Sequence, residues 1–264
     1  MKPIKILHVL NSLGYGGAQG LIIEIYRNIN KELVQFDFLI RNSDKNRQEL
    51  ISEIEKNGGR IFTTSEFPKR IMKNYKELDE FFNQNANEYS AIHVHANSLM
   101  YVRPLKLAHK YKLPCIILHS HNTQAKKNYY RIIHEHNKKH IDRYVTHNFA
   151  CSDLAGKWMF DSRNYSLIKN GIDVDKFKYN EAIRKRVRDS FNFENRLVIG
   201  HVGRFRNQKN HRFIIDIFKE IYTLNNNAIL LLIGSGEDLL FNEIKEKISS
   251  LGLNNNVVLT GDRS

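Results

Sequence analysis

The chain has 264 residues, of which 41% are hydrophobic, and a formal net charge of +13. This length fits two domains of about 100–150 residues each, and the hydrophobic share excludes an intrinsically disordered chain. The two cysteines, Cys115 and Cys151, lie far apart, which argues against a disulfide scaffold and for a reducing cytoplasm. We find no signal-peptide pattern before the first apolar run, and the longest run, residues 228–233, is far too short to span a membrane.

The first part of the chain alternates between apolar runs of strand length and longer stretches with helical spacing. This alternation predicts βαβ units around a parallel sheet of six or seven strands. Strands are predicted at residues 4–10, 35–40, 60–64, 91–96, 114–120, 143–152 and 165–171, and helices at 18–31, 48–58, 74–85, 98–111 and 153–160. The serine at position 152 is predicted to cap the last of these helices, not to act as a nucleophile.

The pattern restarts near residue 196 and predicts a second α/β domain with three strands. Its strands are expected at 196–205, 228–236 and 256–261, and its helices at 208–225 and 237–252. The first of these helices is expected to bury one face, formed by Phe213, Ile214, Ile217, Phe218 and Ile221. We place the domain boundary between residues 169 and 170, which gives domains 1–169 and 170–264.

A cluster of positive charge lies where the strand at 196–205 passes into a helix expected to start near Gln208. Ligands of open parallel sheets bind at the carboxyl ends of the strands, and Arg204 has the planar fork that matches two phosphate oxygens. Lys209 falls in the first helical turn, where the helix dipole disfavours a cation. These features predict a diphosphate site; the alternative is a pair of ordinary surface cations.

A glycine turn follows the first strand. Gly16 and Gly17 would let the backbone approach a phosphate closely. The turn is not a dinucleotide fingerprint, because Gln19 stands where that motif requires glycine. A plain tight turn is the alternative.

Two histidine pairs lie at strand ends: His93 with His95, and His119 with His121. Strand alternation places His119 and His121 on the same face. No cysteine pair and no H-E-x-x-H pattern accompanies them, so we expect no metal site and favour polar contact with a substrate. His8 lies within a strand and is expected in the core.

Six short motifs occur in a recognisable order along the chain. They are GGAQ (16–19), HSHN (119–122), ACSD (150–153), KNGID (169–173), VGRFRNQKNH (202–211) and IGSGE (233–237). In this order they resemble the retaining glycosyltransferases of family 4, most closely the bacterial capsular and exopolysaccharide enzymes. The resemblance implies an α/β protein of the GT-B fold, with two Rossmann-like parallel-sheet domains facing a cleft and the second domain incomplete.

The resemblance also implies a UDP- or GDP-sugar as donor, with no cofactor and no metal. Arg204 and Lys209 match the pair that holds the donor diphosphate, while Gly16 and Gly17 match the loop that closes on the phosphates. His119 matches an acceptor-side histidine near the reacting carbon, with His121 as second choice. Two further glycines, Gly234 and Gly236, match the turn near the base.

The acceptor implied by the resemblance is a glycan, typically lipid-linked. The basic segment 126–139 lies where such enzymes contact an anionic membrane surface, so the expected location is the cytoplasm, peripheral to the inner face of the plasma membrane. Charge alone would also suit a nucleic-acid binder, but no recognition module accompanies it.

The family carries two glutamates eight positions apart, just beyond the point where this sequence ends. We therefore expect a C-terminally truncated chain. The alternative to an active transferase is a non-catalytic nucleotide-binding remnant or one subunit of a split enzyme.

Overall fold

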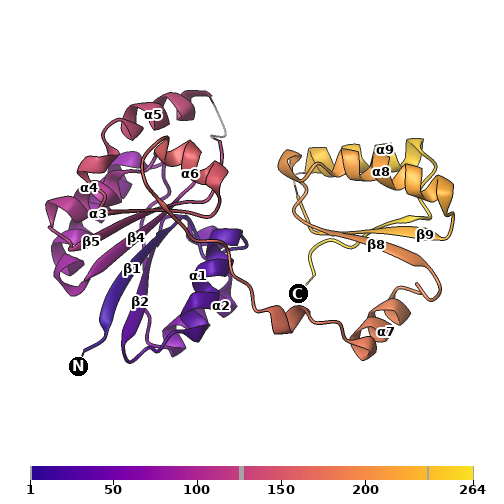
Figure 1. The fold of residues 1–264 in the computed structure, drawn as a ribbon, viewed down its shortest axis with the longest axis horizontal. Coiled ribbons are helices and arrows are strands. Elements are labelled where there is room, and N and C mark those ends of the chain that lie inside the picture. The colour runs from indigo at the N-terminus through magenta and orange to yellow at the C-terminus, as the bar shows by residue number, and fades with distance from the viewer. Residues whose placement is uncertain (1, 125–127, 237, 264) are drawn as a thin grey trace. The chain divides into compact units, whose positions relative to one another are not determined.

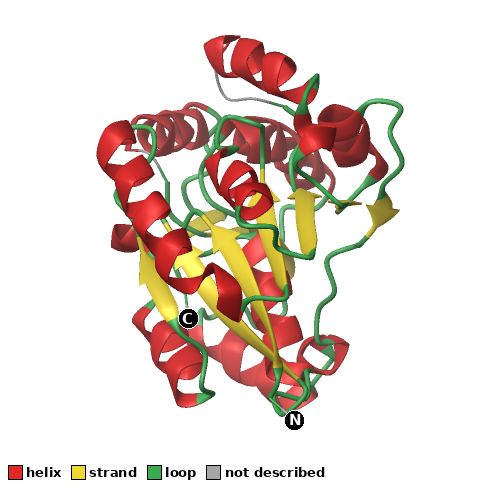
Figure 2. Ribbon diagram, turned by 90° about the vertical axis from the view of Figure 1, so that its left-hand side faces the viewer, coloured by secondary structure: helices red, strands yellow, loops and turns green. Residues whose placement is uncertain are grey.

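The computed structural model describes residues 2–124, 128–236 and 238–263. The chain forms two compact units, Met1–Lys176 and Phe177–Ser264. The sequence placed the boundary after residue 169, seven positions earlier. Helices and strands alternate along the chain in both units; Figure 2 colours them by type.

The first unit is built on a seven-stranded sheet whose neighbouring strands are all parallel. The spatial order is β3-β2-β1-β4-β5-β6-β7, which is the doubly wound arrangement with its switch point between β1 and β4. This confirms the predicted parallel sheet. The strands are β1 (Ile4–Leu10), β2 (Val34–Ile40), β3 (Ile61–Thr63), β4 (Ala91–Ala96), β5 (Cys115–Ser120), β6 (His147–Ala150) and β7 (Ser166–Leu167).

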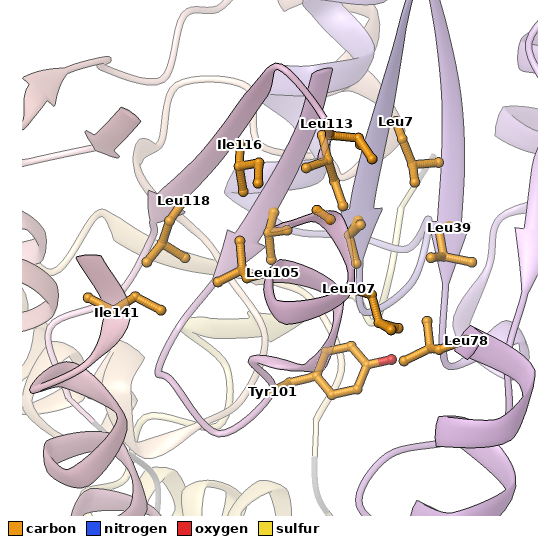
Figure 3. Close-up of a cluster of buried hydrophobic side chains, with 14 of the residues drawn as sticks. Leu7, Leu39, Leu78, Tyr101, Leu105, Leu107, Leu113, Ile116, Leu118 and Ile141 are labelled. Carbon is orange, nitrogen blue, oxygen red and sulfur yellow. The ribbon is translucent and has the colours of Figure 1, made fainter. Parts of the chain in front are cut away.

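Helices cover both faces of this sheet (Figure 1). Helices α1 (Gly17–Asn28) and α2 (Gln48–Lys56) pack on one face through a core centred on Phe38 and Ile54. The other face carries a larger core, drawn in Figure 3, in which Leu7, Leu78 and Leu118 are fully buried. That face is covered by α3 (Ile71–Asn85), α4 (Arg103–Lys110) and α6 (Asp153–Phe160), with α5 (Asn128–Lys138) on the same side.

Several predicted elements of this unit are shorter in the structure. The strand predicted at 143–152 begins only at His147, because residues 141–143 form a short 3-10 helix. The helix predicted at 98–111 begins at Arg103, which puts Pro104 in its first turn, where the missing N–H of proline costs nothing. Ser152 caps α6 as predicted, since its Oγ accepts the backbone N–H of Ala155 at 3.2 Å.

The second unit contains a three-stranded parallel sheet in the order β10-β9-β8, as predicted. The central strand β9 (Ala228–Ile233) is almost entirely buried, between β8 (Leu197–Val202) and β10 (Val257–Leu259). Helices α8 (His211–Leu224) and α9 (Asp238–Ser250) lie side by side on one face of the sheet (Figure 1). Helix α7 (Glu181–Ser190) precedes β8.

Strand β8 lies at the edge of this sheet, and Val202 at its end is 74% exposed. One expectation for this unit was wrong. Helix α8 buries His211, Ile215 and Phe218, whereas two residues of the predicted face, Phe213 and Ile217, are exposed. With 3.6 residues per turn, His211, Ile215 and Phe218 lie on one side of the helix, and this is the buried side.

Within the described residues, no helix combines the length and the apolar character that a membrane-spanning helix needs.

Candidate functional site

The loop after β8 holds Arg204 between two fixed backbone positions. Gly203 donates its N–H to the carbonyl of Ile233 at 2.9 Å, and Phe205 donates to the carbonyl of Ser235 at 2.8 Å. These bonds continue the β8–β9 pairing past the ends of both strands. The Arg204 side chain is exposed at this carboxyl edge of the sheet.

The next residue, Phe205, anchors this loop in the core. Its side chain is fully buried and stacks on His211, the first residue of α8, with ring centroids 4.1 Å apart. Because Phe205 is fixed, the backbone that carries Arg204 is fixed with it.

Positions 234 and 236 need glycine because the backbone there lies very close to the loop after β8. A methyl group on residue 234 would lie 2.3 Å from the carbonyl oxygen of Gly203, and the φ of 137° disfavours any other residue. A methyl group on residue 236 would lie 2.3 Å from Cβ of Phe205. Both glycines therefore position the loop that carries Arg204, a role that the sequence did not suggest.

Lys209 lies in a 3-10 turn, Asn207–Lys209, and not in the first turn of α8 as the sequence suggested. The helix-dipole argument for Lys209 therefore does not apply. Its Cγ and Cδ atoms lie 3.4 Å from the position that a Cβ on Gly203 would occupy. Arg204 and Lys209 thus both adjoin Gly203. Burial, and then the positive charge of Lys209, lowers the pKa of His201 on β8.

In the first unit, the glycine turn follows β1 and opens α1, as predicted. Gly16 is the N-cap of α1, and a methyl group there would meet Oε1 of Gln19 at 2.3 Å. The Nε2 of Gln19 donates to the carbonyl of Ser12 at 3.2 Å, which ties the turn back to the end of β1. The residue that departs from a dinucleotide fingerprint therefore has a structural role in this turn.

Gly17 contacts a residue that the sequence analysis did not single out. A Cβ on Gly17 would lie 3.0 Å from Nδ2 of Asn170. A groove lies between α1 and residues 171–174, and Nζ of Lys176 lies 3.6 Å from the Glu24 carboxylate of α1. The only sequence signal for Asn170 is its place in the KNGID motif.

Five histidines of the first unit form one group, here called the histidine cluster: His8 on β1, His93 and His95 on β4, and His119 and His121 at the end of β5. The structure pairs Nδ1 of His8 with Nε2 of His95 at 3.1 Å. It also pairs Nε2 of His93 with Nδ1 of His119 at 3.2 Å, and Nδ1 of His95 with Nε2 of His121 at 2.9 Å. The two predicted pairs and the predicted core histidine are therefore one assembly.

Burial keeps the histidine cluster neutral. It lowers the pKa of His8 to about 3, that of His119 to about 4 and that of His121 to about 3. His119, the first choice for an acceptor contact, has no exposed surface, whereas His121 is partly exposed. His121 is therefore the better placed of the two for direct contact with a substrate.

The basic segment predicted at 126–139 is helical from Asn128 to Lys138, and Lys126 and Lys127 lie outside the described residues. The exposed surface of α5 combines apolar and basic side chains: Tyr129 is 50% exposed and Ile132 71%, beside the exposed Arg131.

Residues 183–264, which contain Arg204, Lys209 and both loop glycines, match the family model described as "Glycosyl transferases group 1". A Bacillus subtilis (strain 168) protein named "Putative glycosyltransferase EpsF" is 29% identical over 270 residues, covering 97% of this chain and 68% of that protein.

Two solved structures share the fold over the whole chain. Anabaena HepE in complex with UDP and glucose superposes with a TM-score of 0.78 at 18% identity, covering 99% of this chain and 70% of HepE. A glycosyltransferase from Rickettsia africae ESF-5 gives 0.74 at 15% identity, covering 100% of this chain and 69% of that one. The chain thus spans about two thirds of the length of each of these relatives.

The fold is therefore α/β, with parallel sheets of the GT-B type, as the resemblance predicted. The matched family segment and the similarity to EpsF support a glycosyltransferase.

Proposed function

We propose that this protein transfers a sugar from a UDP- or GDP-sugar to a glycan acceptor, with retention of the anomeric configuration, in the biosynthesis of a surface polysaccharide. The class of enzyme is supported by the family segment 183–264 and by EpsF. A nucleotide sugar as donor is supported by HepE, which was solved with UDP and glucose.

The observation that carries the proposal is the position of Arg204 and Lys209. Both adjoin Gly203 at the carboxyl end of β8, the edge at which open parallel sheets bind ligands. The loop is held by the buried ring of Phe205 and by the close approach of Gly234 and Gly236. Two cations on a fixed loop suit a diphosphate, which carries its charge on several oxygens.

In this proposal the two cations act mainly on the leaving group. Cleavage of the sugar–phosphate bond leaves negative charge on the nucleoside diphosphate, and fixed cations stabilise that charge as it develops. The guanidinium of Arg204 offers two parallel N–H donors, and Lys209 adds a point charge.

The first unit is proposed to contribute a phosphate contact and the acceptor site. No side chain caps α1 at Gly16, and we propose that the backbone N–H groups at Gly16 and Gly17 bind a phosphate oxygen of the donor. His121, supported by the buried His119, is proposed to contact the acceptor. The apolar and basic surface of α5 suits an anionic membrane that presents a lipid-linked acceptor.

The first prediction concerns donor binding. We expect Arg204→Ala and Lys209→Ala each to weaken binding of a UDP- or GDP-sugar by about 10- to 100-fold, since each removes a charge-assisted contact to the diphosphate. Isothermal titration calorimetry of the full chain with a panel of both nucleotide-sugar types measures this. Lys185→Ala is the matched control, because it removes one exposed positive charge from α7 of the same unit.

Equal affinity of all three variants would contradict the proposed donor site. Binding of the donor without turnover, in assays with glycan acceptors, would favour the alternative of a non-catalytic nucleotide-binding chain or a subunit of a split enzyme.

A further inference from the structure

The histidine cluster contains more imidazole nitrogens than its internal hydrogen bonds use. Nε2 of His8, Nε2 of His119 and Nδ1 of His121 are buried, and none has a hydrogen-bond partner among the described residues. His8 is 2% exposed and His119 has no exposed surface. Buried polar atoms are normally satisfied, so this many unsatisfied nitrogens in one place calls for an explanation.

The sheet topology explains why the histidines meet. Strand β4 lies between β1 and β5, and the registers place His8 beside His93 and His95 beside His119. His121 is two positions beyond His119 and therefore lies on the same side. Ring centroids of neighbouring members are 4.1 to 5.6 Å apart.

From this geometry we infer that His95, His119 and His121 bind a divalent transition-metal cation of the zinc class. One ligand nitrogen from each of the three lies within 4.8 Å of the others. In a tetrahedral site with Zn–N bonds of about 2.0–2.1 Å, ligand nitrogens are about 3.3 Å apart. The 2.9 Å between Nδ1 of His95 and Nε2 of His121 has to open by only a few tenths of an ångström.

The remaining two histidines, His8 and His93, support two of the three ligands. A ligating histidine usually donates its second N–H to an acceptor, which fixes the tautomer and the ring. Nε2 of His95 lies 3.1 Å from Nδ1 of His8, and Nδ1 of His119 lies 3.2 Å from Nε2 of His93. The cluster thus divides into three ligands and two positioning residues, and it leaves the buried Nε2 of His119 for the cation.

The chemistry of the donor set selects the class of cation. Three neutral imidazoles suit Zn²⁺, Co²⁺, Ni²⁺ or Cu²⁺, whereas Mg²⁺ and Ca²⁺ prefer oxygen ligands. Three protein ligands leave the fourth tetrahedral position for water or a substrate oxygen.

The inference is independent of donor binding, which concerns the second unit. Its test uses the full chain, treated with a chelator and then titrated with Zn²⁺ or Co²⁺ alone. His136→Ala and His140→Ala are built into the background, because these exposed histidines face each other at 5.7 Å and could bind metal by themselves. Cys115→Ser is added, because its Sγ lies 3.7 Å from Nδ1 of His147.

We expect one Zn²⁺ per chain by calorimetry, and the intense visible absorption of tetrahedral Co²⁺. His95→Asn should weaken Zn²⁺ binding by at least 100-fold. His8→Gln, which changes only a positioning residue, should weaken it by about 10- to 100-fold. Of the ligand substitutions, His121→Gln should disturb the fold least, because the side chain is partly exposed at the end of β5.

A measurement on the unsubstituted histidine cluster guards against variants that fail to fold. Imidazole ¹⁵N shifts of the background protein should change on Zn²⁺ addition at one nitrogen each of His95, His119 and His121. Zn²⁺ binding that persists at full strength in His95→Asn, or the absence of a stoichiometric site in the folded background protein, would overturn the inference. In that case the cluster is a hydrogen-bonded histidine network only.

Discussion

The carboxylate of Asp37, on β2, is a buried charge with several hydrogen-bond donors around it. It is 1% exposed and accepts the backbone N–H of Arg60 at 2.8 Å and the guanidinium Nη2 of Arg60 at 2.6 Å. The hydroxyl of Tyr89 donates to it at 2.9 Å. Burial, and then the negative charge of Asp37, raises the pKa of Tyr89, so that hydroxyl keeps its proton and stays a donor. The same guanidinium reaches the exposed Glu88 at 2.9 Å.

This arrangement gives a prediction about stability. Asp37→Ala should lower the free energy of unfolding by about 1–3 kcal/mol, because it leaves the Tyr89 hydroxyl and the backbone N–H of Arg60 without their acceptor. Glu88→Gln removes an exposed carboxylate from the same arginine and should cost only about 0–1 kcal/mol. Urea unfolding followed by the fluorescence of Trp158, the single tryptophan, measures both. Similar losses of unfolding free energy in the two variants would show that the burial of Asp37 does not determine its contribution to stability.

Helix α5 is attached to its neighbours in part by the buried side chain of His134. Nδ1 of His134 accepts the backbone N–H of Leu99 at 3.0 Å, and its Nε2 lies 3.2 Å from the carbonyl of Trp158, so Nε2 carries the proton. The imidazole also stacks on the Trp158 ring, with centroids 4.0 Å apart. One tautomer of one histidine thus joins α5 to the loop after β4 and to α6.

This contact makes the attachment of α5 sensitive to acid. Burial lowers the pKa of His134 below 6.5, and nearby Lys138 acts in the same direction, whereas Glu135 and Asp161 oppose it. The unfolded chain gains a proton near pH 6.5 and the folded chain does not. The stabilisation by His134 is therefore complete above about pH 6.5 and declines as the pH falls toward the lowered pKa.

We expect His134→Gln to speed amide hydrogen exchange in α5 at pH 7.5, by an amount that corresponds to about 1–3 kcal/mol of lost local stability. The difference from the wild type, corrected for the intrinsic exchange rate, should shrink at pH 5.5, because the wild type has by then lost part of the contribution. His136→Gln, an exposed position on the same helix, is the control. A difference that stays constant with pH would refute this account.

In the second unit, the approach of the loop after β9 to the loop after β8 sets the position of Arg204. Gly234→Ala should destabilise this unit by about 1–3 kcal/mol, because alanine must adopt a φ of 137° and its Cβ meets the Gly203 carbonyl. Donor binding should weaken with it. Gly200→Ala is the control on β8, since a Cβ there meets nothing within 4 Å, and it should change stability by less than about 0.5 kcal/mol.

Hydrogen exchange of the central strand β9 reports the stability of this unit, and calorimetry with the nucleotide sugar reports binding. If Gly234→Ala behaves like Gly200→Ala in both measurements, the close approach of the two loops does not position Arg204.

For the whole molecule, the sequence predicted the alternation of strands and helices, because apolar runs and helical spacing are local signals. The order of strands in space is not local. His8 and His95 are 87 positions apart, and the pairing of β1 with β4 brings their ring nitrogens within 3.1 Å. The sequence therefore predicted two histidine pairs and a core histidine where the structure has one cluster.

The same distinction applies to the candidate site. The cations at Arg204 and Lys209 and the glycines at Gly16 and Gly17 could be predicted, because strand-to-helix turns have a local signature. The contact of Gly17 with Asn170 could not, since it depends on how the chain returns to α1 after β7. The buried face of α8 was misjudged because its first member is a histidine and its exposed side carries Phe213.

After β7, residues 170–176 return to α1. These seven residues contact α1 at Gly17 and again at Glu24, and the first unit ends only after Lys176. The segment that contacts the start of α1, where we propose a phosphate contact, is also the last segment of the first unit. A substitution at Asn170 would therefore act both on the start of α1 and on the segment that leads out of the first unit.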